Sequence, residues 1–342
     1  MKLRKLHIED YKMFKDFDIS FVDENDEALP IIVLAGVNGS GKTSLLEYIH
    51  NREYTNNLEF IKKYQLSSKE EVAKVIYDTI YFPSGIDDIE KVSDEFIKTF
   101  YFLLKEKDYR SSEITKHFHE YMKNIFDDLN IGFRYSHLDK DDNLWFSNVD
   151  SKEYYYTAKK SKDKNIFTID ELSTGEKTLL SKVLYLYFEG YKNKVILIDE
   201  PELSLHPSWQ NKVLKIYEKF AKQNNCQIII ATHSPHIITS AENKYIRFLE
   251  KDDEGNVTAM NDIQAYGRDI EWVLHQMGVV DIRLPQITKR FEEIQELINS
   301  GEFDKADESL DKLEYVIGDN DKGILALRND LAFERMDLEE DN

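Results

Sequence analysis

One eight-residue loop carries the residue types that bind a phosphate group. Residues Gly36–Thr43 read G-x-x-x-x-G-K-T, which is the spacing of a P-loop. Glycines let successive backbone N–H groups point at one anion, and the start of the following helix adds partial positive charge. Lys42 has the reach and charge to contact β- and γ-phosphates, and the Thr43 hydroxyl can hold Mg²⁺. The pattern therefore predicts a nucleotide site.

The segments on either side of this loop have the character that a P-loop requires. The apolar run 31–34 before it predicts a buried strand, and residues 44–49 after it predict a helix. We expect the nucleotide to contact seven consecutive residues of this region: Asn38, Gly39, Ser40, Gly41, Lys42, Thr43 and Ser44.

Two other apolar runs end in residues that can do acid–base chemistry. Residues 195–198 are followed by Asp199 and Glu200, and residues 228–231 lead through Thr232 to His233. Continuous apolar runs of this kind are typical of parallel strands buried on both faces. Strands alternating with helices predict a doubly wound α/β sheet, with helices on both faces.

The remainder of the chain divides into regions of different pattern. Residues 1–35 predict short antiparallel strands, and residues 1–50 with 166–262 are the expected core. Residues 51–165 predict an insert, helical as far as 130 and then built of short strands, with Ile80 placed in a helical stripe. Residues 263–342 predict short helices joined by glycine turns, a small bundle that is a candidate partner or oligomer interface.

Composition excludes several classes of protein. The net charge is −20, from 45 basic and 65 acidic residues, so the chain is not a uniformly basic nucleic-acid-binding protein, although a local basic groove stays open. Cys226 is the single cysteine, which excludes an internal disulfide. The sequence has neither an apolar run of about 18 residues nor the apolar core of a signal peptide, so we expect a cytoplasmic protein.

The order of four elements along the chain resembles that of the ATP-binding-cassette (ABC) ATPases, which include the SMC and RecF families. These elements are the P-loop, residues 172–176 (Leu-Ser-Thr-Gly-Glu), the strand that ends at Asp199-Glu200, and His233. The resemblance covers most of residues 1–245. It implies an ABC-type ATPase head that binds ATP with Mg²⁺ and releases ADP and phosphate.

The resemblance also implies a role for each residue. Asp199, with Thr43, holds Mg²⁺; Glu200 is the general base that orients water; and His233 contacts the γ-phosphate. The Leu-Ser-Thr-Gly-Glu stretch is similar to the ABC signature, with Thr at 174 where Gly or Ser is commoner. In that family the signature contacts the nucleotide bound to a second subunit. Ser173, Gly175 and Glu176 are therefore expected to complete the site of a second copy, in a head-to-tail dimer around two ATP.

One element of the family pattern is not found in the sequence. ABC ATPases carry a Q-loop glutamine between the P-loop and the signature. Gln65 is the only glutamine in that interval, and its helical context does not suit the role.

Two further stretches resemble a narrower group. Residues 201–207 (Pro-Glu-Leu-Ser-Leu-His-Pro) are similar to the segment after the catalytic glutamate in RecF-like and OLD-like ATPases. Residues 265–270 and 313–321 are similar to PtuA-type ATPases of Septu and retron anti-phage systems. That resemblance implies a sensor or regulatory scaffold that controls a separate effector, such as an HNH nuclease or a toxin. DNA or retron nucleic acid is a further partner that it suggests.

Two other functions remain open from the sequence. A RecF- or SMC-like ATPase of DNA repair or recombination would bind DNA with steep salt dependence. A transporter nucleotide-binding subunit fits less well, because of residues 201–207, the insert and the helical tail. After His233 we find no acidic cluster of the Toprim nuclease kind and no HNH-like metal set. If DNA is cut, we therefore expect a partner to cut it.

Overall fold

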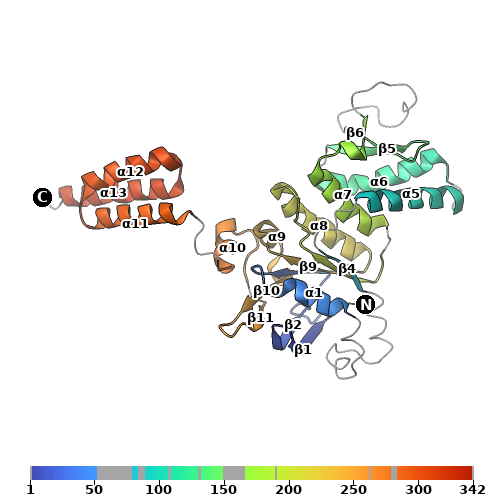
Figure 1. Ribbon diagram of the computed structural model, residues 1–342, viewed down its shortest axis with the longest axis horizontal. Helices are drawn as coiled ribbons and strands as arrows, with labels where there is room; N and C mark the ends of the chain where they lie inside the picture. The colour runs from blue at the N-terminus through green and yellow to red at the C-terminus, as the bar shows by residue number, and fades with distance from the viewer. Residues whose placement is uncertain are drawn as a thin grey trace. The chain divides into compact units, whose positions relative to one another are not determined.

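The computed structural model describes residues 2–51, 79–83, 89–106, 109–129, 132–148, 166–188, 191–261, 263–278 and 283–340. Within these residues the chain forms two compact units, Met1–Val273 and Leu274–Asn342, which are described separately (Figure 1). The boundary between the units lies within helix α10 (Ile270–Gln276). Gln65, the only candidate for a Q-loop glutamine, lies outside the described residues.

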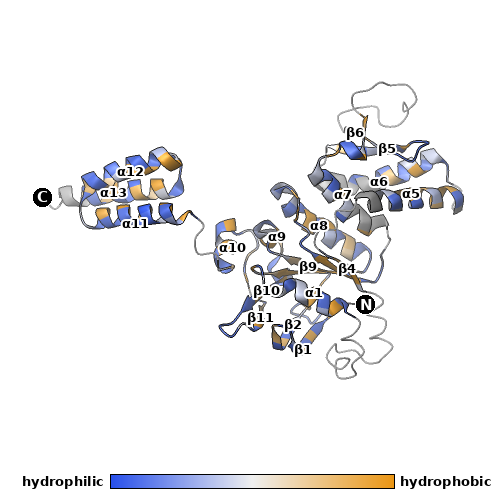
Figure 2. Ribbon diagram, in the orientation of Figure 1, coloured by the Kyte–Doolittle hydropathy of each residue, from blue (hydrophilic) through white to orange (hydrophobic). Residues whose placement is uncertain are grey.

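A mostly parallel sheet forms the centre of the first unit. In the described residues it has six strands in the order β11-β10-β3-β9-β8-β4. Their bounds are β3 Ile31–Ala35, β4 Thr79–Phe82, β8 Val195–Asp199, β9 Gln227–Thr232, β10 Ile246–Lys251 and β11 Val257–Met260. Every residue of β3, β8 and β9 is buried, as the continuous apolar runs predicted, and Figure 2 colours these central strands as hydrophobic.

The register of the sheet brings the ends of three strands together. Strand β9 lies between β3 and β8, and all three are parallel. Ala35 pairs with Thr232, and Ala231 pairs with Asp199. The loops that follow β3, β8 and β9 therefore leave the sheet side by side, at the carboxyl ends of these strands. The carboxyl ends of the strands are where parallel α/β sheets carry their ligand sites.

Helices cover both faces of this sheet. Helix α1 (Lys42–His50) contacts β8 and β9, and α8 (Pro207–Gln223) packs against β9 and β3 from the other side (Figure 1). The antiparallel hairpin of β1 (Lys5–Tyr11) and β2 (Phe14–Ser20) joins the unit through β11. Both the α/β class and the N-terminal antiparallel strands are confirmed.

Strand β4 corrects one expectation from the sequence. The spacing of apolar residues placed Ile80 in a helix, whereas Thr79–Phe82 is an edge strand that is parallel to β8. Thr79 pairs with Val195 and Phe82 with Ile198. A four-residue apolar run is too short for its periodicity to separate strand from helix, and pairing with the buried β8 decides the outcome.

The rest of the insert has its own small aromatic core. Strands β5 (Phe133–Leu138), β6 (Leu144–Asn148) and β7 (Ile166–Thr168) form a three-stranded antiparallel sheet, in agreement with the short strands predicted there. The insert also contains helices α5 (Ile89–Glu106) and α6 (Ser111–Leu129). The rings of Phe96 and Phe118 stack with centroids 4.1 Å apart. The short 3-10 helix η1 (Ile169–Glu171) and helix α7 (Thr174–Phe188) follow β7.

The second unit is a bundle of helices, as the sequence predicted. It contains α11 (Pro285–Asn299), α12 (Phe303–Ile317) and α13 (Lys322–Glu340). Each helix carries both hydrophilic and hydrophobic residues along its length (Figure 2). The apolar sides form one core that includes Ile298, Leu310 and Leu327. Arg328 of α13 binds Asp307 and Glu314 of α12 across the two helices, each at 2.6 Å.

Candidate functional site

The P-loop connects β3 to α1 in a conformation that only glycine adopts easily. Gly36 has φ +148°, and a Cβ atom there would lie 2.5 Å from the backbone oxygen of Leu249. Gly41, the residue that precedes α1, has φ +96°, and a Cβ atom there would meet Phe14 at 2.9 Å. Any other residue at these two positions would clash or strain the loop. The glycine pattern is therefore a requirement of the backbone.

The Lys42 side chain lies within the P-loop. Its side chain is buried, and Nζ donates to the carbonyl oxygens of Gly36 and Val37, both at 2.8 Å. Burial lowers the pKa of Lys42, while the charges of Glu200 and Asp199 act in the opposite direction. An ammonium group held only by two carbonyls has a strong preference for an anion, so this position suits a phosphate.

Four other residues expected to contact nucleotide differ in their surroundings. Asn38 and Gly39 are exposed at the tip of the loop. Ser40 is buried, and within the described residues its hydroxyl has no hydrogen-bond partner. The hydroxyl of Ser44, at the first turn of α1, lies 3.5 Å from Nζ of Lys12. The same Nζ donates to Oε2 of Glu47 at 2.9 Å. The tip of the loop is therefore open to solvent, whereas Ser40 is not.

Thr43 and Asp199 supply the oxygen ligands expected for a divalent cation. The Thr43 hydroxyl donates to Oδ2 of Asp199 at 2.9 Å. Oδ1 of Asp199 is buried and has no hydrogen-bond partner among the described residues, and burial raises the pKa of this carboxyl group. A buried carboxylate oxygen without a partner fits a hard cation, and Mg²⁺ typically takes only one or two protein oxygens besides phosphates and water. The residues present therefore fit Mg²⁺.

Glu200 and His233 form a pair beside this cation site. His233 Nδ1 lies 2.9 Å from Oε1 of Glu200, and because a carboxylate accepts, the imidazole N–H donates. Glu200 has φ +47°, a left-handed conformation that is unfavourable for a residue with a side chain. Its backbone N–H donates to the carbonyl of Ala231 at 2.8 Å, which fixes this conformation against β9. The turn after β8 therefore aims the Glu200 carboxylate at His233.

Glu202 belongs to the same cluster, although the sequence did not identify it. Its side chain is buried, and Oε1 accepts from the hydroxyl of Thr232 at 2.5 Å and from the backbone N–H groups of His233 and Ser234 at 3.1 and 3.2 Å. A third acid that follows Asp199 and Glu200 so closely was the available signal. Its partners lie about 30 positions further along the chain, so only the fold discloses its contacts.

The signature-like residues form a separate group at the start of α7. The backbone N–H and hydroxyl of Ser173 donate to Oε2 of Glu176 at 2.9 and 2.7 Å, and the Glu176 N–H donates back to the Ser173 hydroxyl at 3.3 Å. This is a capping box, which satisfies the first donors of a helix. Among the described residues, no hydrogen bond joins Ser173 or Glu176 to the P-loop. The Ser173 and Glu176 side chains therefore bind each other and not Lys42 of their own chain.

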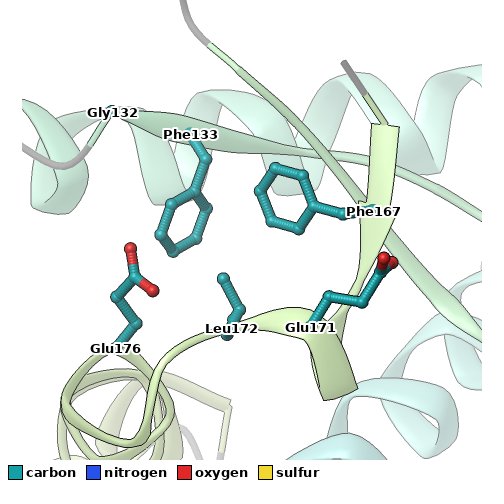
Figure 3. A pocket seen from close by; sticks show the side chains of 6 residues that line it. All are labelled: Gly132, Phe133, Phe167, Glu171, Leu172 and Glu176. Carbon is teal, nitrogen blue, oxygen red and sulfur yellow. The ribbon is translucent and has the colours of Figure 1, made fainter. Parts of the chain in front are cut away.

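Two cavities border the start of α7. One of about 610 Å³ is lined by Ser173, Gly175, Ser204, Leu205, His206, Ser208 and Trp209. A Cβ atom at Gly175 would lie 3.3 Å from the Ser204 carbonyl oxygen and 3.4 Å from the Trp209 ring, so the glycine permits this close packing. The other, of about 350 Å³, lies between Phe133, Phe167 and Leu172, with the carboxylates of Glu171 and Glu176 beside it (Figure 3).

A glycine-rich loop between β3 and α1, with an acid at the end of β8 two strands away in the same sheet, defines a P-loop nucleoside triphosphatase. The chain belongs to the family described as "AAA domain, putative AbiEii toxin, Type IV TA system", whose profile matches residues 50–239. Residues 1–75 also match the profile described as "AAA ATPase domain". Membership in a P-loop ATPase family implies that the chain binds ATP.

Three curated proteins are similar to parts of the chain. "Retron Ec83 probable ATPase" of Escherichia coli is 31% identical over 42% of this chain and 28% of its own length. "Septu protein PtuA" of Bacillus thuringiensis is 27% identical over 52% of this chain and 48% of its own length. "OLD nuclease" of Thermus scotoductus is 31% identical over 26% of this chain and 17% of its own length. The chain thus spans less than half of each relative, and it is related to ATPases of anti-phage systems.

Solved structures of SMC heads are distantly similar. The SMC head domain from Thermotoga maritima covers 76% of this chain and 99% of its own, with a TM-score of 0.46 and 14% identity. Within the described residues, no helix combines the length and apolar character needed to cross a lipid bilayer.

Proposed function

We propose that this chain is an ABC-type ATPase that binds ATP with Mg²⁺ at the P-loop and hydrolyses it. The supporting observation is the meeting of Lys42, Thr43, Asp199, Glu200 and His233 at one edge of the sheet. The sequence provides the residue types, and the register of β3, β8 and β9 explains why they are neighbours.

The phosphates are held by the loop and by the helix start. Lys42 exchanges the carbonyl oxygens of Gly36 and Val37 for β- and γ-phosphate oxygens, which is favourable because charge meets charge in a dry site. Backbone N–H groups of residues 38–44 bind the remaining phosphate oxygens. When bound, Mg²⁺ neutralises the phosphate charge, and Thr43 and Asp199 are the residues that hold it.

Glu200 accepts the proton of the attacking water. Oε1 of its carboxylate accepts the His233 N–H, and Oε2 is the oxygen left to accept from water. Because Nδ1 of His233 binds Glu200, Nε2 is the ring nitrogen that would contact the γ-phosphate. One imidazole thereby joins the base to the γ-phosphate contact.

A head-to-tail dimer completes each site from a second copy. Ser173, Gly175 and Glu176 lie at the N-terminus of α7, where the helix dipole favours an anion. The capping bond from Ser173 to Glu176 keeps this turn preformed, and the Ser173 hydroxyl exchanges Glu176 for a phosphate of the partner copy. ATP would then act as a dimerisation switch.

In the cell, the ATPase would serve as the sensor or regulatory scaffold of an anti-phage system and control a separate effector. This part of the proposal is supported by the similarity to Septu and retron ATPases. An HNH nuclease encoded nearby is the expected effector. The second unit offers a contact surface, because Tyr315, Phe333 and Met336 are exposed apolar side chains on α12 and α13.

The enzymatic part is tested with purified protein. Wild type should release phosphate from ATP, Glu200→Gln should bind ATP with no turnover, and Lys42→Ala should lose binding by at least about tenfold. Lys222→Ala is the matched control, because Lys222 lies at the surface of α8, where it binds Glu218 at 2.6 Å. Normal turnover by Glu200→Gln would exclude Glu200 as the base. The cellular part is tested by co-expression with the neighbouring gene, and protection or toxicity from the ATPase alone would contradict it.

A further inference from the structure

We infer that Glu202 is the positioning residue that sets His233 in the nucleotide site. It anchors the backbone of residues 232–234 and competes with Glu200 for the imidazole N–H. The inference deepens the proposed function and rests on it for the kinetic consequence, whereas the anchoring itself can be measured without nucleotide.

The anchoring follows from three bonds to one oxygen atom. Oε1 of Glu202 accepts the hydroxyl of Thr232, the last residue of β9, and the N–H groups of His233 and Ser234, which connect β9 to α9 (Pro235–Ser240). His233 and Ser234 have left the β ladder and precede the helix, so their N–H groups need acceptors. The Ser234 N–H also donates to the Thr232 hydroxyl oxygen at 2.9 Å, so Glu202 is above all the acceptor for His233.

A second contact closes the same arrangement from α8. The Ser234 hydroxyl donates to Oε1 of Gln210 at 2.7 Å, and Nε2 of Gln210 donates to the carbonyl oxygen of Leu205 at 2.9 Å. The turn that contains Glu202 is thus tied to α8, and α8 to the segment of His233. A shift of the acid pair after β8 would be transmitted to His233 through these bonds.

The competition follows from two distances to one nitrogen. His233 Nδ1 lies 2.9 Å from Oε1 of Glu200 and 3.6 Å from Oε1 of Glu202. A small rotation of the imidazole would exchange Glu200 for the Glu202 carboxylate, whose Oε2 has no hydrogen-bond partner among the described residues. Oε1 of Glu200 would then join Oε2 as an acceptor for water, while His233 would keep a charged acceptor. Glu202 thus makes the release of Glu200 Oε1 a short movement.

The burial of Glu202 favours such a role over a contribution to stability. Its side chain is 5% exposed, and within the described residues its Oε2 atom is buried without a hydrogen-bond partner. A buried carboxylate with one unsatisfied oxygen is costly, and an apolar or hydroxyl side chain would fill a turn at lower cost. The three donors on Oε1 explain what the carboxylate does there.

Amide hydrogen exchange tests the anchoring in the nucleotide-free full-length chain. Glu202→Ala should speed exchange at His233 by at least about tenfold, because its N–H loses its acceptor, and less at Ser234, whose N–H also donates to the Thr232 hydroxyl oxygen at 2.9 Å. Amides inside β9, such as Ile229, should keep their rates. Glu218→Ala is the control, since Glu218 of α8 also accepts a hydrogen bond, from the Tyr245 hydroxyl at 2.7 Å, but lies outside this network. Equal rates at residue 233 in the two variants would overturn the inference.

Steady-state kinetics test the competition. Glu202→Gln keeps an acceptor for the backbone but loses the charge, so kcat should fall about tenfold with KM for ATP within about twofold. In a His233→Ala background the same change should have less than about a twofold effect, since the ring is gone. Equal losses in both backgrounds would overturn the inference. If wild type shows no turnover, the proposed function fails, while hydrogen exchange still decides whether Glu202 anchors residues 232–234.

Discussion

Thr43 and Asp199 are 156 positions apart in the chain and are joined by a hydrogen bond of 2.9 Å between Oγ1 and Oδ2. This bond links the first turn of α1 to the last residue of β8. It fixes two oxygen-bearing side chains at the point where a phosphate on Lys42 would meet the sheet. The second oxygen of Asp199 is left without a partner among the described residues, which gives the site its preference for a cation.

Replacing Asp199 should therefore uncouple nucleotide binding from magnesium. In Asp199→Asn the amide oxygen can still accept from Thr43, but the charge is gone. Wild type should show a larger rise in Tm with ATP and Mg²⁺ than with ATP and EDTA. In the variant this difference should disappear, while the shift with ATP and EDTA stays. Asp252→Asn is the control, because Asp252 is exposed in the turn between β10 and β11 and accepts from Asn256 N–H. A magnesium-dependent shift that survives in Asp199→Asn would remove Asp199 as the ligand.

The same substitution should have a pH-dependent effect on the free protein. Burial raises the pKa of Asp199, so the folded state holds its proton to higher pH than the unfolded state does. The charge therefore costs stability at neutral pH, and the cost fades as the pH falls through the folded-state pKa. Asp199→Asn should be more stable than wild type in urea at pH 7, with a gain that shrinks towards pH 4. A gain that grows on acidification would contradict this assignment.

The left-handed conformation of Glu200 predicts a trade between stability and turnover. Glu200→Gly and Glu200→Ala both remove the carboxylate, but only glycine adopts φ +47° without strain. Glu200→Gly should unfold at a higher urea concentration than Glu200→Ala, and its free energy of unfolding should be larger by about 1 kcal/mol. Neither should hydrolyse ATP. Equal stability of the two variants would mean that the turn relaxes when the carboxylate is lost.

Local pattern was sufficient for the elements that are buried on both faces. The runs before Gly36 and before Asp199 predicted β3 and β8, because a strand buried in a parallel sheet has no polar positions. It was insufficient for β4, since Thr79–Phe82 becomes a strand only by pairing with β8. A strand at the edge of a sheet is specified by its neighbour more than by its own residues.

The residues of the candidate site differ in the same way, since some follow from local pattern and others only from the fold. The P-loop follows a spacing that can be read directly, whereas Glu202 depends on the folded position of residues 232–234. Ser173 and Glu176 illustrate a pattern with two meanings. The spacing S-x-x-E is that of a capping box as well as part of the signature-like stretch, so the sequence could have predicted their mutual hydrogen bonds.

Ser173 caps α7 and is also proposed to contact the nucleotide of the second copy, so replacing it tests the dimer directly. Ser173→Arg places a bulky side chain at the start of α7, where the second copy's nucleotide is proposed to bind. In a Glu200→Gln background with ATP, the parent should elute as a dimer and Ser173→Arg as a monomer, with ATP affinity per monomer within about threefold. The cap is lost too, at a cost of about 1 kcal/mol, so the comparison needs a variant with the same defect.

Thr168→Arg provides this control, because Thr168 and Glu171 form another capping box, at the start of η1. It should lose similar cap energy and still dimerise with ATP. Light scattering after size exclusion measures both variants. Dimers from Ser173→Arg would show that α7 does not face the second nucleotide. Loss of ATP binding in the Ser173→Arg monomer would instead mean that Ser173 acts on the site of its own chain.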